Sequence, residues 1–339
     1  MRKLHLFIVM IFCFSINLEA KIITDMTGRN VEVTHVTKAF SASPPMMAML
    51  YVLAPKTMIG VNYEFLEVEK TFMHPYIRDL PVLGGFFGGG KEANMEMIIA
   101  KKPDIVFGWD RLSNEAKRSK DTLESFGIPV AYIKQDTLEE MLEALSVMSS
   151  YLGKEERAKI LIKYAKKSLD RVKKSVLNLD KPKAKVYLAQ GIDGLQTECS
   201  NGVQSEIITY AGGVNVHECA ANAKTYKREK ISFEKLMQYD PDVIFVREAS
   251  FFHNLKNSST WKHLRAFKEN KIFLVPSSPF PWVSKPPSLM RFLGVAWLHK
   301  RIYPEYFDWD EEQEIKSFYE LFLDIKLNND DLNYLMQGV

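Results

Sequence analysis

Residues 94–107 read NMEMIIAKKPDIVF and residues 232–245 read SFEKLMQYDPDVIF, so one pattern occurs twice in the chain. In each stretch a glutamate is followed seven positions later by Pro-Asp and then by an apolar run. The pattern predicts a short amphipathic helix, a turn and a buried strand in both places. Pro-Asp turns are common, so coincidence is one explanation. The equal spacing favours the other, in which the chain forms two similar lobes.

A long uninterrupted segment, Glu155 to Asn178, lies between the two copies of this pattern. It contains neither Gly nor Pro over 24 residues, and its apolar residues recur near helical spacing. A helix of that length spans about 36 Å at about 1.5 Å per residue. We therefore expect a stiff helix that links the two lobes. A long surface helix of a single domain is the alternative.

The rest of the chain alternates short apolar strands with helical segments, which predicts parallel, doubly wound sheets. A β-hairpin is expected around the turn at Gly28, and residues 62–91 show little regular pattern. The fold class is therefore α/β, with two Rossmann-like lobes joined by a single long α-helix and a ligand cleft between the lobes. The expected segments are the N-terminal lobe, the linking helix and the C-terminal lobe, at residues 21–152, 153–180 and 181–339.

The N-terminal residues 1–20 have the features of a signal peptide. Arg2 and Lys3 precede an apolar stretch, and Ala20 provides a small residue at the expected cleavage point. The apolar stretch is short for a membrane span, which needs about 20 residues. We therefore expect a cleaved signal and a periplasmic product, with a retained N-terminal anchor as the alternative.

Composition and cysteine content narrow the function further. The chain has 339 residues, enough for two domains, and a formal charge of +3 without a basic run, so no nucleic acid partner is expected. Cys199 and Cys219 remain after cleavage, and an isolated pair in the periplasm favours a disulfide. Closing that loop of about 20 residues would contribute about 3 kcal/mol. Two separate buried thiols are the alternative, and no HxH or CxxC stands nearby to suggest a zinc site.

The chain resembles the periplasmic receptors for iron-siderophores, corrinoids and haem, the group with one rigid interdomain helix. The likeness runs from about Thr24 to Pro304 and is closest to the enterochelin-type receptors of Helicobacter and Campylobacter, one branch of which is linked to nickel chelates. It is carried by motifs in both halves, namely Asn94-Met95-Glu96, Pro103-Asp104, Phe233-Glu234, Pro241-Asp242, Pro286-Pro287, Trp297-Leu298 and Tyr303-Pro304-Glu305.

This resemblance implies a substrate-binding protein of an ABC importer, without a cofactor of its own and without enzymatic activity. Its ligand would be an iron(III) or nickel(II) chelate, and its partner an ABC permease in the inner membrane. We expect it to act as a monomer. Haem, a corrinoid or a free metal ion remain alternative ligands. A periplasmic enzyme is disfavoured, because the sequence has neither a GxSxG nor an HExxH motif.

One glutamate on each lobe meets arginines of the permease in this family. Motif by motif, the resemblance assigns that role to Glu96 and Glu234. Carboxylates held at a fixed distance on two rigid lobes would match two basic pockets of the permease at the same spacing. The plain alternative is that each is a solvated helix residue.

Ligands of two-lobe α/β proteins bind at the carboxyl ends of the strands. Arg111 and Arg247 follow equivalent strands of the two lobes and could clamp an anionic chelate with forked donors. Aromatic side chains near strand ends could pack on its rings, and these are Tyr63, Trp109 and Trp282. The alternatives are surface ion pairs for the arginines and core packing for the aromatic residues. Other polar candidates after strands are Ser41, Ser43, Gln190 and Asp193.

A single histidine could complete the coordination of iron or nickel. Of seven histidines one, His5, lies in the signal segment, and the remaining six form neither HxH nor HxxxH. His74, in the long loop of the first lobe, and His217, after Gly212-Gly213, are the best placed metal ligands. Isolated histidines are more often structural or exposed.

Overall fold

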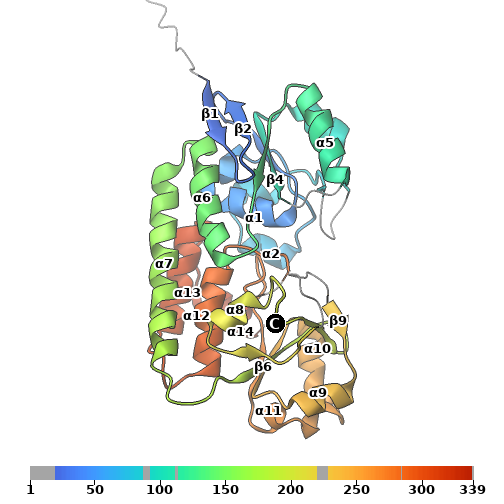
Figure 1. Ribbon diagram of the computed structural model, residues 1–339, viewed down its shortest axis with the longest axis vertical. Coiled ribbons are helices and arrows are strands. Elements are labelled where there is room, and N and C mark those ends of the chain that lie inside the picture. The colour runs from blue at the N-terminus through green and yellow to red at the C-terminus, as the bar shows by residue number, and fades with distance from the viewer. Residues whose placement is uncertain (1–19, 87–91, 111–113, 220–227, 284, 338–339) are drawn as a thin grey trace, which may run out of the picture.

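The computed structural model describes residues 20–86, 92–110, 114–219, 228–283 and 285–337. Figure 1 shows two α/β lobes arranged along the long axis of the molecule, with the helix α7 (Glu155–Leu177) lying beside both. The expected fold class is confirmed. Within the described residues, none of the helices is both long enough and apolar enough to span a bilayer.

The N-terminal lobe is built on a parallel sheet of three strands in the order β3-β4-β5. Its strands are β3 (Ala39–Ser41), β4 (Ile105–Trp109) and β5 (Val130–Ile133). The expected hairpin forms from β1 (Lys21–Thr24) and β2 (Asn30–Val33). The helices are α1 (Pro44–Leu53), α2 (Glu67–Thr71), α3 (Pro75–Arg78), α4 (Met95–Lys101), α5 (Asn114–Ser125) and α6 (Leu138–Leu152).

After α1, Pro55–Thr57 forms a 3-10 helix, and isolated bridges at Met58 and Val61 follow it. The loop of residues 62–91 is more ordered than expected, since it holds α2 and α3. The helix α1 is buried on all sides, which agrees with its unbroken apolar sequence.

The C-terminal lobe has a parallel sheet of four strands in the order β11-β10-β6-β8. Its strands are β6 (Lys185–Ala189), β8 (Val214–Asn215), β10 (Val243–Val246) and β11 (Ile272–Leu274). A separate antiparallel ribbon, which the sequence did not suggest, pairs β7 (Gln196–Glu198) with β9 (Arg228–Lys230). The helices are α8 (Glu206–Tyr210), α9 (Phe233–Tyr239), α10 (Ala249–Asn254), α11 (Arg265–Lys268) and α12 (Arg291–Ile302), with 3-10 turns at Leu255–Asn257 and Trp261–His263.

The repeated sequence pattern has the same structure in both lobes. The helices α4 and α9 are each seven residues long and end on a residue in the left-handed region, Lys102 and Asp240. Their first turns are capped by side chains, with Asn94 accepting from the N–H of Met97 and Ser232 from that of Lys235.

The aspartate of each Pro-Asp pair fastens the turn to the neighbouring strand. The Oδ2 of Asp104 accepts the N–H of Lys38 at 2.8 Å, and the Oδ2 of Asp242 accepts that of Lys185 at 2.7 Å. Both aspartates also donate their own N–H to the same residues, Lys38 and Lys185, at 2.8 Å. The pattern therefore reflects two lobes of one design rather than coincidence.

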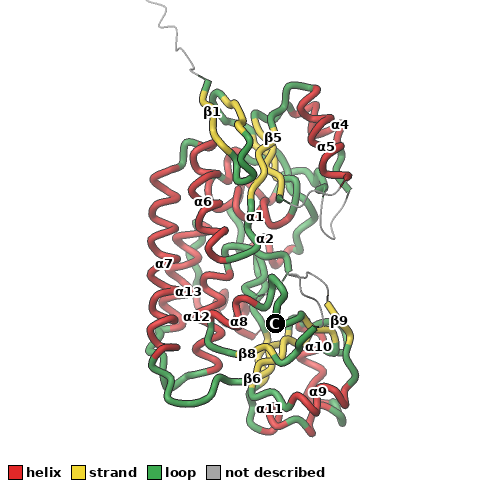
Figure 2. Tube along the Cα trace, viewed as in Figure 1, coloured by secondary structure: helices red, strands yellow, loops and turns green. Residues whose placement is uncertain are grey.

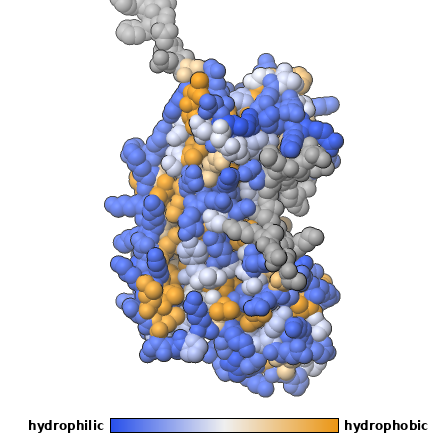
Figure 3. Space-filling model, in the orientation of Figure 1, coloured by the Kyte–Doolittle hydropathy of each residue, from blue (hydrophilic) through white to orange (hydrophobic). Residues whose placement is uncertain are grey.

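The helix α7 has 23 residues and a length of about 35 Å. It packs against α6 of the N-terminal lobe and α12 of the C-terminal lobe. Arg157 near its start donates to the carbonyl of Val52 in α1 at 2.8 Å and to that of Leu321 at 2.9 Å. Figure 2 shows α7 as the outermost helix of a layer beside both lobes, and Figure 3 shows apolar patches along this side of a mostly hydrophilic surface.

The C-terminal segment crosses back to the first lobe. It comprises α13 (Glu311–Phe318), a π-helical turn (Tyr319–Leu323) and α14 (Asn329–Gln337). The Oη of Tyr51 donates to the carbonyl of Leu323 at 3.1 Å, and Phe72 stacks on Tyr334 with ring centroids 5.8 Å apart. Residues 311–337, which the expected boundaries group with the C-terminal lobe, therefore pack against α7 and the N-terminal lobe as well.

His299 of α12 provides a test of this packing. It is fully buried, with its Nδ1 2.9 Å from the carbonyl of Ala211 and its Nε2 2.7 Å from the Oγ of Ser175 in α7. Burial lowers the pKa of His299, and the hydrogen bond to Ala211 opposes this. His299 therefore binds a proton less readily in the folded chain than in the unfolded chain. The free energy of unfolding falls as the pH drops below about 6.5, the ordinary pKa of histidine in an unfolded chain.

We predict that His299→Gln flattens this part of the pH dependence of stability. Urea unfolding at about pH 7.5 and about pH 5.5 should show the wild type losing more unfolding free energy than the variant. The difference is limited to about 1.4 kcal/mol per pH unit, the slope for one proton. Equal losses in the two proteins would show that His299 does not titrate in this way.

Candidate functional site

The carboxyl ends of the strands in the two sheets face the region between the lobes. The segment after β5 reaches the C-terminal lobe, where the N–H of Leu138 donates to Glu206 in α8 at 3.1 Å. Asp136 of the same segment interacts electrostatically with Arg291 of α12. Phe65 meets Phe280 edge to face, with centroids 6.2 Å apart. The interlobe region is therefore the expected ligand-binding edge of an open α/β sheet.

Polar side chains that follow the strands of the N-terminal lobe are buried there. Ser41 and Ser43 flank the end of β3, Asn62 follows the bridge at Val61, and Gln135 follows β5, and all are fully buried. Among the described atoms, both hydroxyls, the Oδ1 of Asn62 and both amide atoms of Gln135 have no hydrogen-bond partner. Buried polar groups are normally paired, so several orphan groups at one edge indicate a ligand or water site.

The C-terminal lobe contributes a second set of such groups. Gln190 follows β6, Thr197 lies in β7, and Gln204 precedes α8, and each has a buried atom without a partner in the described part of the chain. Arg291 is fully buried and donates through Nη2 to the carbonyl of Val203 at 3.1 Å, while its Nε and Nη1 are unpaired among the described atoms. We call these eight residues the interlobe polar layer, which consists of Ser41, Ser43, Asn62, Gln135, Gln190, Thr197, Gln204 and Arg291.

Two carboxylates, one from each lobe, lie near the guanidinium of Arg291. Its Nη2 lies 3.3 Å from a carboxylate oxygen of Glu206. Burial lowers the pKa of Arg291, while the charges of Glu206 and Asp136 raise it. An arginine stays protonated in proteins, so Arg291 brings a buried positive charge to the layer.

A charged group adjoins the layer at the ends of β6, β7 and β10. Glu198 is fully buried, with its Oε1 3.4 Å from the Nζ of Lys285 and 3.4 Å from the Nε2 of Gln190. Burial raises the pKa of Glu198, and Lys285 opposes that shift. Arg247 donates to Glu248 and to the carbonyl of Lys285, both at 3.2 Å.

Arg247 therefore lies where the sequence predicted, at the carboxyl end of β10, and is partly exposed there. Arg111 lies outside the described residues, so the clamp formed by both arginines stays a prediction. Glu198, Lys285 and Arg291 were missed, because nothing local marks a charged residue whose partner lies far away in the chain. Asp193 pairs with Lys230 of β9 at 2.8 Å.

Trp282 lies inside the protein, and its role in stacking on a ligand stays a prediction. Its side chain is fully buried, donates to the Oη of Tyr319 at 3.3 Å, and packs on Trp297 with centroids 6.3 Å apart. The backbone at Trp282 lies very close to α12 at Gly294. A Cβ on Gly294 would come within 2.1 Å of the Trp282 carbonyl oxygen, so only a glycine allows this approach. The loop that contains Trp282 therefore packs closely against α12, and the Trp282 side chain lies in the core.

The other aromatic candidates also lie largely inside the protein. Trp109 at the end of β4 is 7% exposed. Tyr63 is half-buried and packs on Phe65 with centroids 4.8 Å apart, and burial raises its pKa. Their roles as ligand-stacking residues stay predictions.

The two candidate metal ligands have different surroundings. The Nδ1 of His74 accepts the N–H of Tyr76 at 3.2 Å and so caps α3, which is a structural role. His217 belongs to the one group of potential metal ligands found among the described residues, together with Cys199, Cys219 and Glu229. The structure joins Cys199 and Cys219 in a disulfide, the first of the two alternatives.

Glu96 and Glu234 are exposed and occupy the second position of α4 and α9. Hydrogen bonds from its own backbone and from Ser232 lower the pKa of Glu234, so this carboxylate is charged at neutral pH. Figure 2 places α4 near the upper end of the molecule and α9 near the lower end, one on each lobe. The docking role of these two glutamates stays a prediction.

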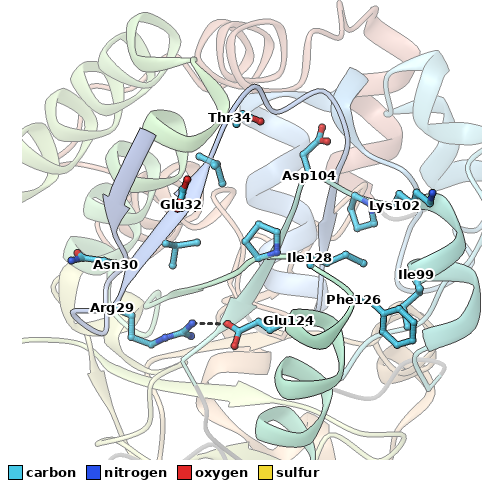
Figure 4. Close-up of a pocket in the computed structure, with 15 residues that line it drawn as sticks. Arg29, Asn30, Glu32, Thr34, Ile99, Lys102, Asp104, Glu124, Phe126 and Ile128 are labelled. Carbon is cyan, nitrogen blue, oxygen red and sulfur yellow. Dashed lines mark hydrogen bonds and ion pairs between the residues drawn. The ribbon is translucent and has the colours of Figure 1, made fainter. Parts of the chain in front are cut away.

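A surface pocket on the N-terminal lobe lies at the opposite edge of the sheet. It is lined by Arg29 and Glu32 of the hairpin region, by Asp104 before β4, and by Ile128 before β5 (Figure 4). The ion pair between Arg29 and Glu124, at 2.8 Å, crosses it. Because the pocket adjoins the amino ends of the strands, it is separate from the interlobe polar layer.

Comparison with known families agrees with this architecture. Residues 86–279 match the family model described as periplasmic binding protein. The chain belongs to the periplasmic binding protein family. A solved ABC transporter solute-binding protein from Sulfurospirillum deleyianum is 34% identical, with a TM-score of 0.84, and the match covers 93% of this chain and 99% of that one. The resemblance found in the sequence is thus confirmed at the level of the family.

More distant relatives bind different metal species. The molybdate-binding protein MolA of Haemophilus influenzae is 25% identical over 331 residues, which cover 89% of this chain and 90% of MolA. The nickel-histidine complex of Helicobacter pylori CeuE is 15% identical with a TM-score of 0.69, covering 94% and 99% of the two chains. At that identity CeuE shares the fold alone. These relatives are binding proteins rather than enzymes.

We predict that Trp282→Phe lowers stability without changing ligand affinity. The substitution removes a buried hydrogen bond and part of a ring from the core, which should cost about 1–3 kcal/mol of unfolding free energy. Chemical denaturation and calorimetric titration of the same samples measure the two quantities. A loss of ligand affinity without a loss of stability would show that Trp282 contacts the ligand.

Proposed function

We propose that this periplasmic binding protein of an ABC importer carries a small anionic metal complex, either an iron(III) or a nickel(II) chelate. The observation that carries the proposal is the interlobe polar layer, where side chains from both lobes bring unpaired donors and acceptors to the strand ends. The buried charge of Arg291 and the guanidinium of Arg247 favour an anion. Among the relatives, CeuE carries a nickel complex of histidine.

A metal oxyanion is a second candidate. The layer is made mainly of hydroxyl and amide groups, which hydrogen-bond oxygen atoms. The molybdate-binding relative extends over almost the whole chain. Haem and corrinoid ligands, whose large flat rings would stack on aromatic side chains, stay alternative ligands.

The cellular setting follows from the family. We propose that residues 1–20 are removed on export and that the mature monomer works in the periplasm. Loaded protein would then dock on the inner-membrane permease through Glu96 and Glu234. Residues 1–19 lie outside the described part of the chain.

The ligand can be identified on protein purified from its own periplasm by native mass spectrometry. Calorimetry then compares a ferric catecholate, nickel-histidine, molybdate, haem and a corrinoid with the free metal ions. We expect tight binding of one anionic complex and weak binding of free Fe³⁺ and Ni²⁺. A free ion that binds as tightly without any chelator or oxo groups would defeat the proposal.

We predict that Gln135→Leu and Gln190→Leu, one from each lobe, each lower the affinity for that ligand about tenfold. Each loses a hydrogen bond worth about 1 kcal/mol or more. Gln135→Leu should not lose stability, because both amide atoms of Gln135 lack a partner among the described atoms. Gln190→Leu also removes the hydrogen bond from its Nε2 to Glu198 and should lose about 1 kcal/mol. Gln313→Leu on the outer helix α13 is the matched control. Unchanged affinity in both interlobe variants would show that the layer does not bind the ligand.

We predict that Glu96→Lys and Glu234→Lys impair transport while leaving ligand affinity intact. Each replaces a docking carboxylate by a charge that arginines of the permease repel. Stimulation of permease ATPase activity by loaded protein should fall several-fold in each variant and further in the double variant. Glu143→Lys, on the exposed face of α6, controls for the change in net charge. If the double variant stimulates the permease as strongly as the wild type does, these glutamates do not contribute to docking.

A further inference from the structure

A compact group of potential metal ligands lies in the C-terminal lobe, apart from the interlobe polar layer. The Sγ atoms of Cys199 and Cys219, a ring nitrogen of His217 and a carboxylate oxygen of Glu229 all lie within 4.8 Å of one another. We propose that the dithiol form of this group binds a thiophilic divalent cation, with Zn²⁺ as the reference ion. The disulfide and the metal site are then alternative states of one cross-link.

The fold builds this group from three short segments between Cys199 and Glu229. Cys199 directly follows β7, His217 follows β8, and Glu229 lies in β9, the partner strand of β7. The N–H of Ser200 donates to the carbonyl of His217 at 2.7 Å, which ties the first two segments together. The Oγ of Ser205 donates to the carbonyl of Cys199, also at 2.7 Å. These bonds would hold the ligands in place in the absence of the disulfide.

His217 is oriented as metal-binding histidines are. It is 5% exposed, with its Nδ1 2.9 Å from the Oη of Tyr239 and its Nε2 3.1 Å from a carboxylate oxygen of Glu229. The tautomer that donates from Nδ1 to Tyr239 leaves the lone pair of Nε2 directed at the group. A hydrogen bond at the second ring nitrogen is the usual support for a ligating imidazole.

The ligand types suit zinc or nickel. Two thiolates, one imidazole and one carboxylate make a four-coordinate set of the kind that holds structural Zn²⁺. The two thiolates and the carboxylate carry three negative charges, of which the cation neutralises two. The sequence analysis identified Cys199, Cys219 and His217 as candidates. Glu229 lies near them because β7 pairs with β9, and the sequence did not reveal this pairing.

The change of state requires a reductant, for which we specify a dithiol. The dithiol transfers two electrons and two protons to the Cys199–Cys219 bond, which breaks into two thiols, and the reductant closes to its own disulfide. The cation then displaces the two thiol protons. A small-molecule disulfide reverses the sequence, because it accepts two electrons and two protons as the Cys199–Cys219 bond re-forms. The metal is then released, since a sulfur bonded to sulfur is not a thiolate.

The position of the group connects it to the ligand region. Glu198, which reaches Lys285 and Gln190, is the residue next to Cys199 in the chain. The side-chain amide of Asn215 donates to the carbonyl of Glu198 at 2.9 Å, and the Oδ1 of Asn215 accepts the N–H of His217 at 3.0 Å. Either cross-link therefore anchors the strand that carries Glu198. This inference stands whichever solute the protein transports.

The test uses purified mature protein, reduced with a phosphine under anaerobic conditions or left oxidised. Co²⁺ serves as a spectroscopic probe, and Zn²⁺ competition gives the affinity. We expect the reduced protein to bind one Co²⁺ with thiolate-to-cobalt charge-transfer absorption, and to bind Zn²⁺ at least about 100-fold more tightly than the oxidised protein. The interlobe layer contains no thiol, so the absorption reports this group alone.

Four variants complete the experiment. Cys199→Ser with Cys219→Ser should abolish the charge-transfer absorption, and His217→Gln and Glu229→Gln should each weaken Zn²⁺ binding at least about tenfold. Glu229 is exposed, so its variant tests the site without disturbing the core. His35→Gln, at an exposed histidine of the other lobe, should change nothing. Equal affinity of the reduced and oxidised proteins, or full affinity in both the His217 and Glu229 variants, would overturn the proposal.

Discussion

The structure depends on an apolar core that continues from one lobe into the other. One cluster of buried side chains includes Phe107 of the first sheet, Leu161 of α7 and Phe245 of the second sheet. Arg157 and the C-terminal segment fasten the same interface by hydrogen bonds to α1. The lobes are thus joined by close-packed side chains as well as by one helix, and close-packed interiors deform little.

This constraint explains why polar groups remain unpaired between the lobes. If the lobes could rotate freely, side chains such as Gln135 and Gln190 could relax into partners or into solvent. Held apart by α7, they keep orphan donors and acceptors at the strand ends, and a ligand with complementary groups can satisfy them. A fixed separation would also keep Glu96 and Glu234 at a constant distance for the permease. In the function we propose, ligand capture and docking would both rely on this rigid connection.

The parts of the fold that follow local periodicity could be predicted from the sequence. The repeated helix–turn–strand, the long helix and the hairpin are all marked by patterns within about 25 residues. Trp282 could not be placed, because an aromatic residue in a loop looks the same in sequence whether it faces a ligand or the core. Arg291 and Glu198 were missed for a related reason, since their burial is decided by partners far along the chain. Arg247, by contrast, was located correctly because it directly follows a recognisable strand.

The central claim is that the solute sits between the strand ends of the two lobes. The most direct test is a crystal structure of the loaded protein with anomalous diffraction at the absorption edge of the bound metal. The account predicts one strong peak between Ser41 and Gln135 on one side and Gln190 and Arg291 on the other. A peak at the pocket beside Arg29 and Asp104, or on the outside of either lobe, would contradict it.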